Sequence, residues 1–122
     1  MQVHLASTER NYRETEGEFG SAKVLEDILQ MIRTAGIPYA VVLLPTQPQL
    51  QTSLATQLAD YRRLGQEITE RQGGHWWNAM ELLDATEYAD SIHPNARGRE
   101  KYSAALGKWL GETFGTEVGD AR

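Results

Sequence analysis

Hydrophobic side chains recur along this chain with two different periods, and the order of the two periods predicts its elements. Over residues 21–35 they recur every three or four positions, which predicts an amphipathic helix that Gly36 ends. Residues 37–45 follow as an apolar run rich in β-branched side chains. Such a run is typical of a strand buried on both faces of a parallel sheet. We therefore expect a helix followed by a buried strand.

The second half of the chain repeats this order. The helical spacing returns over residues 50–68 and predicts either one long helix or two helices broken near Gly65. Residues 75–79 predict a short strand, and a polar loop over residues 84–93 leads to a last helix that ends at Gly115. This alternation of helices and strands predicts an α/β fold with a parallel sheet and right-handed crossovers.

The two ends of the chain have weaker patterns. Residues 1–6 alternate, with Val3 and Leu5 on one side, and predict a short strand. Residues 7–20 predict a solvated polar loop, and residues 116–122 predict a frayed tail. Three strands make a small sheet for this fold class, so we expect further elements of the domain to lie outside this chain.

Composition limits the classes of function. A chain of 122 residues with 40% hydrophobic and 24% charged residues is one globular domain. Its net charge of −5 disfavours a nucleic-acid partner, and its lack of cysteine excludes thiolate catalysis and cysteine-ligated zinc. The longest apolar run is too short for a membrane span, and the N-terminus does not resemble a signal peptide. The compartment stays open.

Candidate chemistry lies in the loop before the last helix. Asp90 precedes His93 by three residues, so its carboxylate can turn back and accept the Nδ1 proton, which leaves Nε2 free as a base. Pro94 restricts the loop, Asn95 is a natural cap for the helix, and Gly98 is a close-packing position. The alternative is a surface turn without catalytic function, because this spacing often occurs by chance.

A longer string contains the pair: Asp90-x-x-His93-Pro94-Asn95-x-x-Gly98-x-x-x-Tyr102-x-x-x-Leu106. It resembles the C-terminal block of the SGNH/GDSL hydrolase family, including its alginate O-acetyltransferase-like branch, and the predicted order of elements over residues 21–114 is similar to that family. The resemblance implies a partial three-layer α/β/α, flavodoxin-like domain with a short parallel sheet. Residues 21–115 would be the C-terminal half of that domain.

The resemblance also implies an activity. Members of the family hydrolyse or transfer acyl esters with a serine nucleophile, an oxyanion hole, and an Asp and His pair. His93 would be the general base and Asp90 its orienter, acting on acyl esters, acylated carbohydrates or lipids. No cofactor and no metal is implied.

The serine part of this pattern is absent from the sequence. No Gly-Asp-Ser-like segment occurs, and the family's Gly-x-Asn-Asp block would align with residues 5–9, which hold neither glycine nor asparagine. A base without its nucleophile gives almost no covalent catalysis, so we expect this chain alone to be inactive. Two classes of function stay open: the C-terminal portion of an esterase or O-acyltransferase, and a non-catalytic binding or interaction module.

Other features favour structural roles. Trp76 and Trp77 could form a platform for sugars, but neighbouring strand residues face opposite sides, which favours core packing. His4 and His75 could join His93 in a zinc site, although nothing in their spacing supports it. Because the strand at residues 37–45 is apolar on both faces, we expect self-association as a homodimer or association with the missing N-terminal half.

Overall fold

Helices and strands alternate along residues 21–115, the range that the computed structural model describes. The elements are α2 (Ser21–Thr34), β1 (Ala40–Leu43), α3 (Pro48–Ser53), α4 (Ala55–Arg71), β2 (His75–Asn78), the 3-10 helix η1 (Ala85–Glu87) and α5 (Ala96–Phe114). Three of the expected segments lie outside this range: the strand at residues 1–6, the loop at residues 7–20 and the tail at residues 116–122. The α/β class is confirmed, and none of the described helices has the length and apolarity needed to cross a bilayer.

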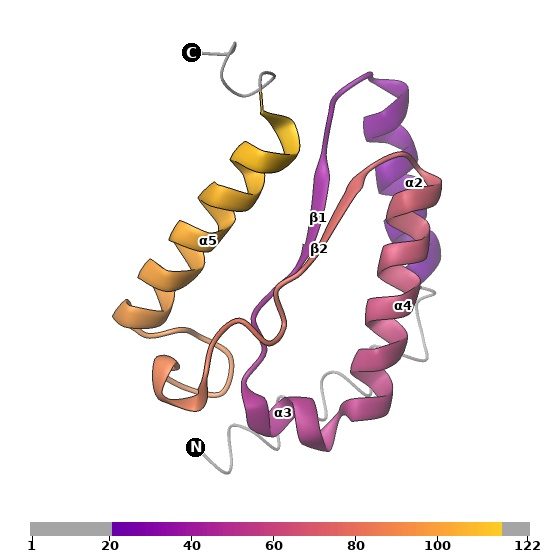
Figure 1. The fold of residues 1–122 in the computed structure, drawn as a ribbon. Coiled ribbons are helices and arrows are strands. Elements are labelled where there is room, and N and C mark those ends of the chain that lie inside the picture. The colour runs from indigo at the N-terminus through magenta and orange to yellow at the C-terminus, as the bar shows by residue number, and fades with distance from the viewer. Residues whose placement is uncertain (1–20, 116–122) are drawn as a thin grey trace.

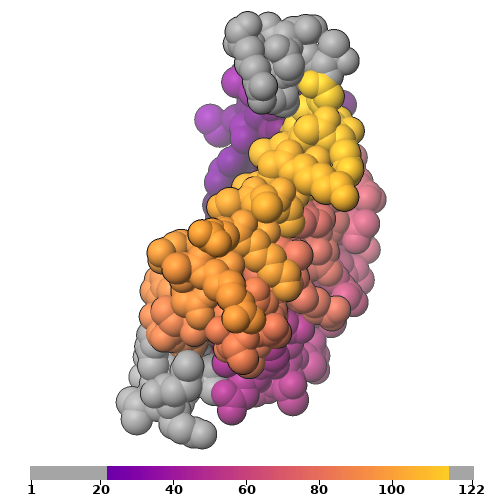
Figure 2. Space-filling view, turned by 60° about the vertical axis from the view of Figure 1, so that its left-hand side comes forward, coloured from indigo at the N-terminus to yellow at the C-terminus, as the bar shows by residue number. Residues whose placement is uncertain are grey.

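β1 and β2 form a two-stranded parallel sheet in which Ala40 pairs with His75 and Leu43 with Asn78. Helix α5 lies on one face of this sheet, and α2 and α4 lie together on the other (Figure 1). In the space-filling view, α5 forms a ridge across its side of the molecule, orange through yellow (Figure 2). The chain therefore places helices on both faces of a very narrow sheet.

The two tryptophans of β2 anchor these helices from opposite faces of the sheet. The Trp77 ring stacks on Trp109 at 5.5 Å and on Tyr102 at 6.2 Å between centroids, and both partners belong to α5. Trp76 faces α4, where a Cβ on Gly65 would lie 2.8 Å from its ring. Both side chains pack between elements, so the core-packing interpretation is confirmed.

The break in the predicted long helix falls at Leu54, and the prediction of a break near Gly65 is wrong. Leu54 separates α3 from α4 with φ −115° and ψ 28°, and its side chain is buried in a cluster with Leu50, Leu58 and Met80. Helix α4 continues through Gly65, because a residue without Cβ at that position admits the indole of β2. Burial of an apolar side chain thus outweighs the low helix propensity of glycine.

Strand β1 is less buried than its apolar composition predicts. All four of its side chains are only half-buried, and Leu44, directly after it, is 61% exposed. β2 is the one strand that pairs with β1 within residues 21–115, so the other edge lacks cover. The expectation of a strand buried on both faces is therefore wrong for the described part of the chain.

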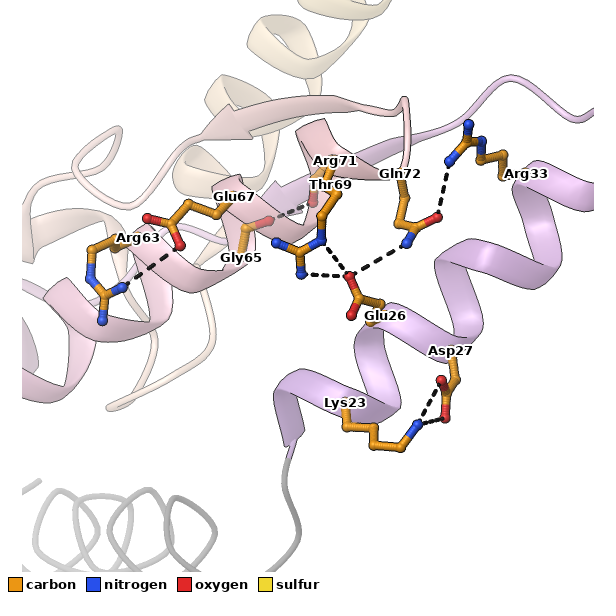
Figure 3. A network of polar contacts seen from close by, with 10 residues as sticks. All are labelled: Lys23, Glu26, Asp27, Arg33, Arg63, Gly65, Glu67, Thr69, Arg71 and Gln72. Carbon is orange, nitrogen blue, oxygen red and sulfur yellow. Dashed lines mark hydrogen bonds and ion pairs between the residues drawn. The ribbon is translucent and has the colours of Figure 1, made fainter.

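Polar contacts connect α2 to α4 at the surface (Figure 3). The carboxylate of Glu26 accepts hydrogen bonds from Arg71 and from Gln72, and Arg33 donates to the same glutamine at 3.5 Å. The hydrogen bond from Arg71 lowers the pKa of the Glu26 carboxyl. Exposed contacts of this kind contribute little stability.

Candidate functional site

The loop between β2 and α5 lies at the carboxyl end of the sheet, next to the loop that connects β1 to α3 (Figure 1). A hydrogen bond from the Thr46 N–H to the Met80 carbonyl at 3.0 Å joins the two loops, and Gln51 Nε2 of α3 donates to the same carbonyl at 3.2 Å. Ligands of parallel α/β sheets usually bind at this edge. The fold therefore presents the candidate residues where such a sheet places its site.

Asp90 and His93 form the side-chain pair that their spacing predicts. One carboxylate oxygen, Oδ1, accepts the backbone N–H groups of Ile92 at 2.9 Å and His93 at 2.7 Å, which closes a tight turn. His93 Nδ1 lies 2.8 Å from Asp90 Oδ2 and 3.0 Å from Oδ1. The hydrogen bond is confirmed, and it favours the tautomer with the proton on Nδ1 and the lone pair on Nε2. The imidazole is 68% exposed, so a reactant can reach it.

These hydrogen bonds also determine the charge of the carboxylate. The backbone N–H of Ile92, then the His93 side chain and the His93 N–H, together lower the pKa of Asp90 to about 2. Asp90 is therefore an anion throughout the pH range in which the protein would work.

The free energy of unfolding should fall more steeply with acid in the wild-type chain than in Asp90→Asn. Folding lowers the pKa of Asp90, so its contribution is complete above the unfolded pKa, near 4, and is lost as the pH falls through about 2. Asparagine does not titrate, so Asp90→Asn removes this pH-dependent contribution to the free energy of unfolding. Urea unfolding at successive pH values between about 4 and 2 measures the two slopes. Equal slopes would contradict the lowered pKa.

Backbone hydrogen bonds on both sides of His93 make its position rigid. The Ala89 N–H donates to the His93 carbonyl at 2.7 Å, and the Asn95 N–H donates to the Glu87 carbonyl at 2.9 Å. The side chain of Asn95 accepts from the Gly98 N–H at 3.0 Å, so the predicted cap of α5 is confirmed. His93 is thus held at the junction between a closed loop and the first turn of a helix.

Glu87 is a supporting residue that the sequence analysis missed within its polar loop. The residue is buried, with 3% of its surface exposed, and Oε1 accepts the Asp84 N–H at 2.9 Å. The same oxygen lies 3.2 Å from Nζ of Lys101 on α5. The spacing Asp84-x-x-Glu87 is that of a capping box, and this motif could have identified the contact to Asp84. Its pairing with Lys101 depends on how α5 packs against the loop.

Gly98 allows this close packing. A Cβ at Gly98 would lie 2.3 Å from the Glu87 carbonyl oxygen and 3.0 Å from the Pro94 side chain. The first turn of α5 can therefore rest on the loop only if this position has no side chain. The expectation that Gly98 is a close-packing position is confirmed.

Of the other two histidines, only His75 is described, and it is not brought to this site. His75 lies at the start of β2, at the opposite end of the sheet from the loop, with its ring edge-on to Phe114 at 5.0 Å. His4 lies outside the described residues. No group of three or more His, Asp or Glu side chains within residues 21–115 has an arrangement that could hold a metal ion. The zinc interpretation gains no support from this part of the chain.

The serines that the structure describes lie in helices or, in the case of Ser91, in the protein interior. Ser91, between Asp90 and His93 in the sequence, is completely buried, so its hydroxyl is not presented to a substrate. Ser53 and Ser103 lie in helices α3 and α5. None of these positions resembles a strained turn that exposes a nucleophile. The described residues therefore pair Asp90 with His93 without indicating a serine that this pair could activate.

Comparison of the chain with protein-family models, with curated proteins and with solved structures gives no match. The resemblance to the SGNH/GDSL hydrolases therefore depends on the string from Asp90 to Leu106.

Proposed function

We propose that this chain is the C-terminal portion of an SGNH/GDSL-like esterase or O-acyltransferase. The observation that carries the proposal is the contact of 2.8 Å between His93 Nδ1 and Asp90 Oδ2, in a rigid loop at the carboxyl end of a parallel sheet. His93 is the general base in this proposal, and Asp90 orients it. The substrates are acyl esters, acylated carbohydrates or lipids.

The proposed reaction follows from the free lone pair on Nε2 of His93. Nε2 takes the proton of a serine hydroxyl while the serine oxygen attacks the acyl carbonyl, and Asp90 stabilises the resulting imidazolium. The imidazolium then returns the proton to the alcohol that leaves, and an acyl-serine remains. Water or an acceptor hydroxyl, deprotonated by the same nitrogen, completes hydrolysis or transfer. The serine and the oxyanion hole come from polypeptide outside residues 21–115.

The proposal includes a complete three-layer, flavodoxin-like domain and association of this chain. Helices on both faces of a two-stranded sheet support such a domain, because this arrangement extends by adding strands at a free edge. Exposed apolar side chains of α2 and around β1 support association, either with the N-terminal half of the domain or with a second copy.

A non-catalytic binding module is the second candidate. The burial of Ser91 and the helical positions of the other described serines favour it, because they leave His93 without an indicated nucleophile. In this alternative the Asp90–His93 turn shapes the end of the sheet, where a partner or carbohydrate would bind.

A fluorophosphonate that labels activated serines distinguishes the two candidates in the complete native protein. We expect labelling of the wild type, loss of labelling in His93→Ala, and retention in His75→Ala, the control at the opposite end of the sheet. Labelling of His93→Ala at the wild-type rate would contradict the role of His93. An unlabelled wild type would favour the binding module.

A further inference from the structure

The loop before α5 folds back on itself as a short antiparallel hairpin. The Asn95 N–H donates to the Glu87 carbonyl at 2.9 Å, and the Ala89 N–H donates to the His93 carbonyl at 2.7 Å. The two hydrogen bonds enclose an antiparallel bridge between the two arms of the hairpin. Asp90 lies in the turn and His93 at the start of the returning arm. The position of this pair therefore depends on what holds the base of the hairpin.

Glu87 lies at that base and brings a carboxylate into the protein interior. Its side chain is only 4% exposed, and Oε1 accepts the Asp84 N–H at 2.9 Å. Nζ of Lys101 lies 3.2 Å from the same oxygen, and within residues 21–115 Lys101 is the one cation that pairs with this carboxylate. A buried carboxylate that loses its cation is strongly destabilised, because water does not replace the lost charge.

Lys101 differs from Glu87 in its contact with water. It reaches the carboxylate from α5, whose first turn rests on the loop, and its own side chain is 48% exposed. Loss of a half-exposed cation costs little by itself, because water covers most of the space that it leaves. The main consequence of removing Lys101 is therefore the buried carboxylate that stays behind.

We propose that Lys101 is a positioning residue for His93, an inference that rests on the proposed function. Lys101 compensates the charge of Glu87 and so keeps the base of the hairpin against α5. Without the cation, the carboxylate moves toward water and displaces the hairpin that holds the imidazole. A displacement of about 1 Å at a reacting group lowers a rate by about 10²-fold.

Three lysine variants of the complete native protein test this role with p-nitrophenyl acetate as the acyl ester. Lys101→Met keeps the aliphatic chain and removes the cation, so we expect kcat to fall by about 10–100-fold while KM changes by less than about threefold. Lys101→Arg retains the charge and should keep kcat within about threefold of wild type. Lys108→Met, at an exposed position of the same helix, is the matched control and should leave both constants unchanged.

A double variant shows whether Lys101 acts through Glu87. Glu87→Gln removes the buried charge, and its amide oxygen can still accept the Asp84 N–H. Added to Lys101→Met, it should therefore restore kcat to within about fivefold of wild type, because no unpaired carboxylate remains. A lysine that contacted the substrate directly would show no such recovery.

Amide hydrogen exchange in the same proteins tests the positioning without any reference to activity. The Ala89 N–H closes the hairpin on the His93 carbonyl, so Lys101→Met should speed its exchange at least about tenfold. Lys101→Arg and the double variant should leave it slow. The Ala79 N–H, which donates to the Leu43 carbonyl in the sheet, should stay slow throughout and reports whether each variant keeps its fold.

The two readouts separate a failure of this inference from a failure of the proposed function. A wild-type protein without esterase activity would contradict the proposed function, and exchange at Ala89 would still test the positioning. Equal exchange at Ala89 in the wild type and in Lys101→Met would overturn the inference, as would an unchanged kcat in an active protein. A double variant that folds but recovers neither readout would also overturn it, and this variant decides the question if Lys101→Met does not fold.

Discussion

Under the proposed function, replacing Asp90 by asparagine is expected to lower kcat/KM of the complete protein on an acyl ester by on the order of 10⁴, the effect of the same change in a serine-protease triad. Oδ1 of the new side chain can still accept the N–H groups of Ile92 and His93, so the turn persists. Its NH₂ group then faces Nδ1 of His93 and donates to it. The imidazole proton is forced onto Nε2, where the base needs a lone pair.

Asp84→Asn is the matched control for this change. Asp84 also accepts a backbone N–H within the loop, that of Thr86 at 2.9 Å, but it belongs to the cap of η1. We expect kcat/KM of this variant to stay within a few-fold of wild type. Equal losses in Asp84→Asn and Asp90→Asn would show that the loop, and not the tautomer of His93, determines the rate.

The geometry can be tested separately from the activity. ¹⁵N NMR of the 122-residue chain distinguishes the two neutral tautomers of His93. We expect the proton on Nδ1 in the wild type and on Nε2 in Asp90→Asn. The same tautomer in both proteins would contradict the argument from the hydrogen bond. A tautomer change without any effect on activity would contradict the proposed function, but it would leave the argument from the hydrogen bond intact.

Gly98→Ala is expected to give the largest loss of stability of any glycine-to-alanine change in α5. The new Cβ would lie 2.3 Å from the Glu87 carbonyl oxygen, a backbone atom that also accepts the Asn95 N–H. Either the helix or the loop must shift, and overpacking of this kind costs about 1–3 kcal/mol. Urea unfolding monitored by circular dichroism measures the change in the free energy of unfolding.

Gly107→Ala, in the same helix, is expected to raise the free energy of unfolding instead of lowering it. A Cβ at Gly107 meets no atom within 4 Å, so alanine there should stabilise the chain by about 0.5–1 kcal/mol through its higher helix propensity. If Gly98→Ala proved as stable as Gly107→Ala, α5 would not rest on the Glu87 carbonyl. The pair of variants thus separates a packing effect from a general property of glycine in helices.

Much of the candidate site could be predicted because its contacts are local in sequence. The side chain of Asp90 reaches only three residues forward to His93, and Asn95 caps the helix that starts at the next residue. The contacts of Glu87 could be predicted in part. Its bond to Asp84 is local, whereas its pairing with Lys101, fourteen positions away, requires that α5 is docked.

Local sequence by itself determined the alternation of helices with the strands β1 and β2, because hydrophobic spacing and capping residues act over a few positions, but it did not predict the 3-10 helix η1 within the polar loop. Tertiary structure alone decided where α3 ends and α4 begins, since Leu54 leaves the helical path when it is buried and Gly65 stays helical against Trp76. It also decided that β1 is half-buried, because burial depends on which strands are its neighbours and not on its own composition. The apolar composition of β1 predicts that it is buried, and only the arrangement of elements in space shows that β2 pairs with one of its edges while the other is unpaired within residues 21–115.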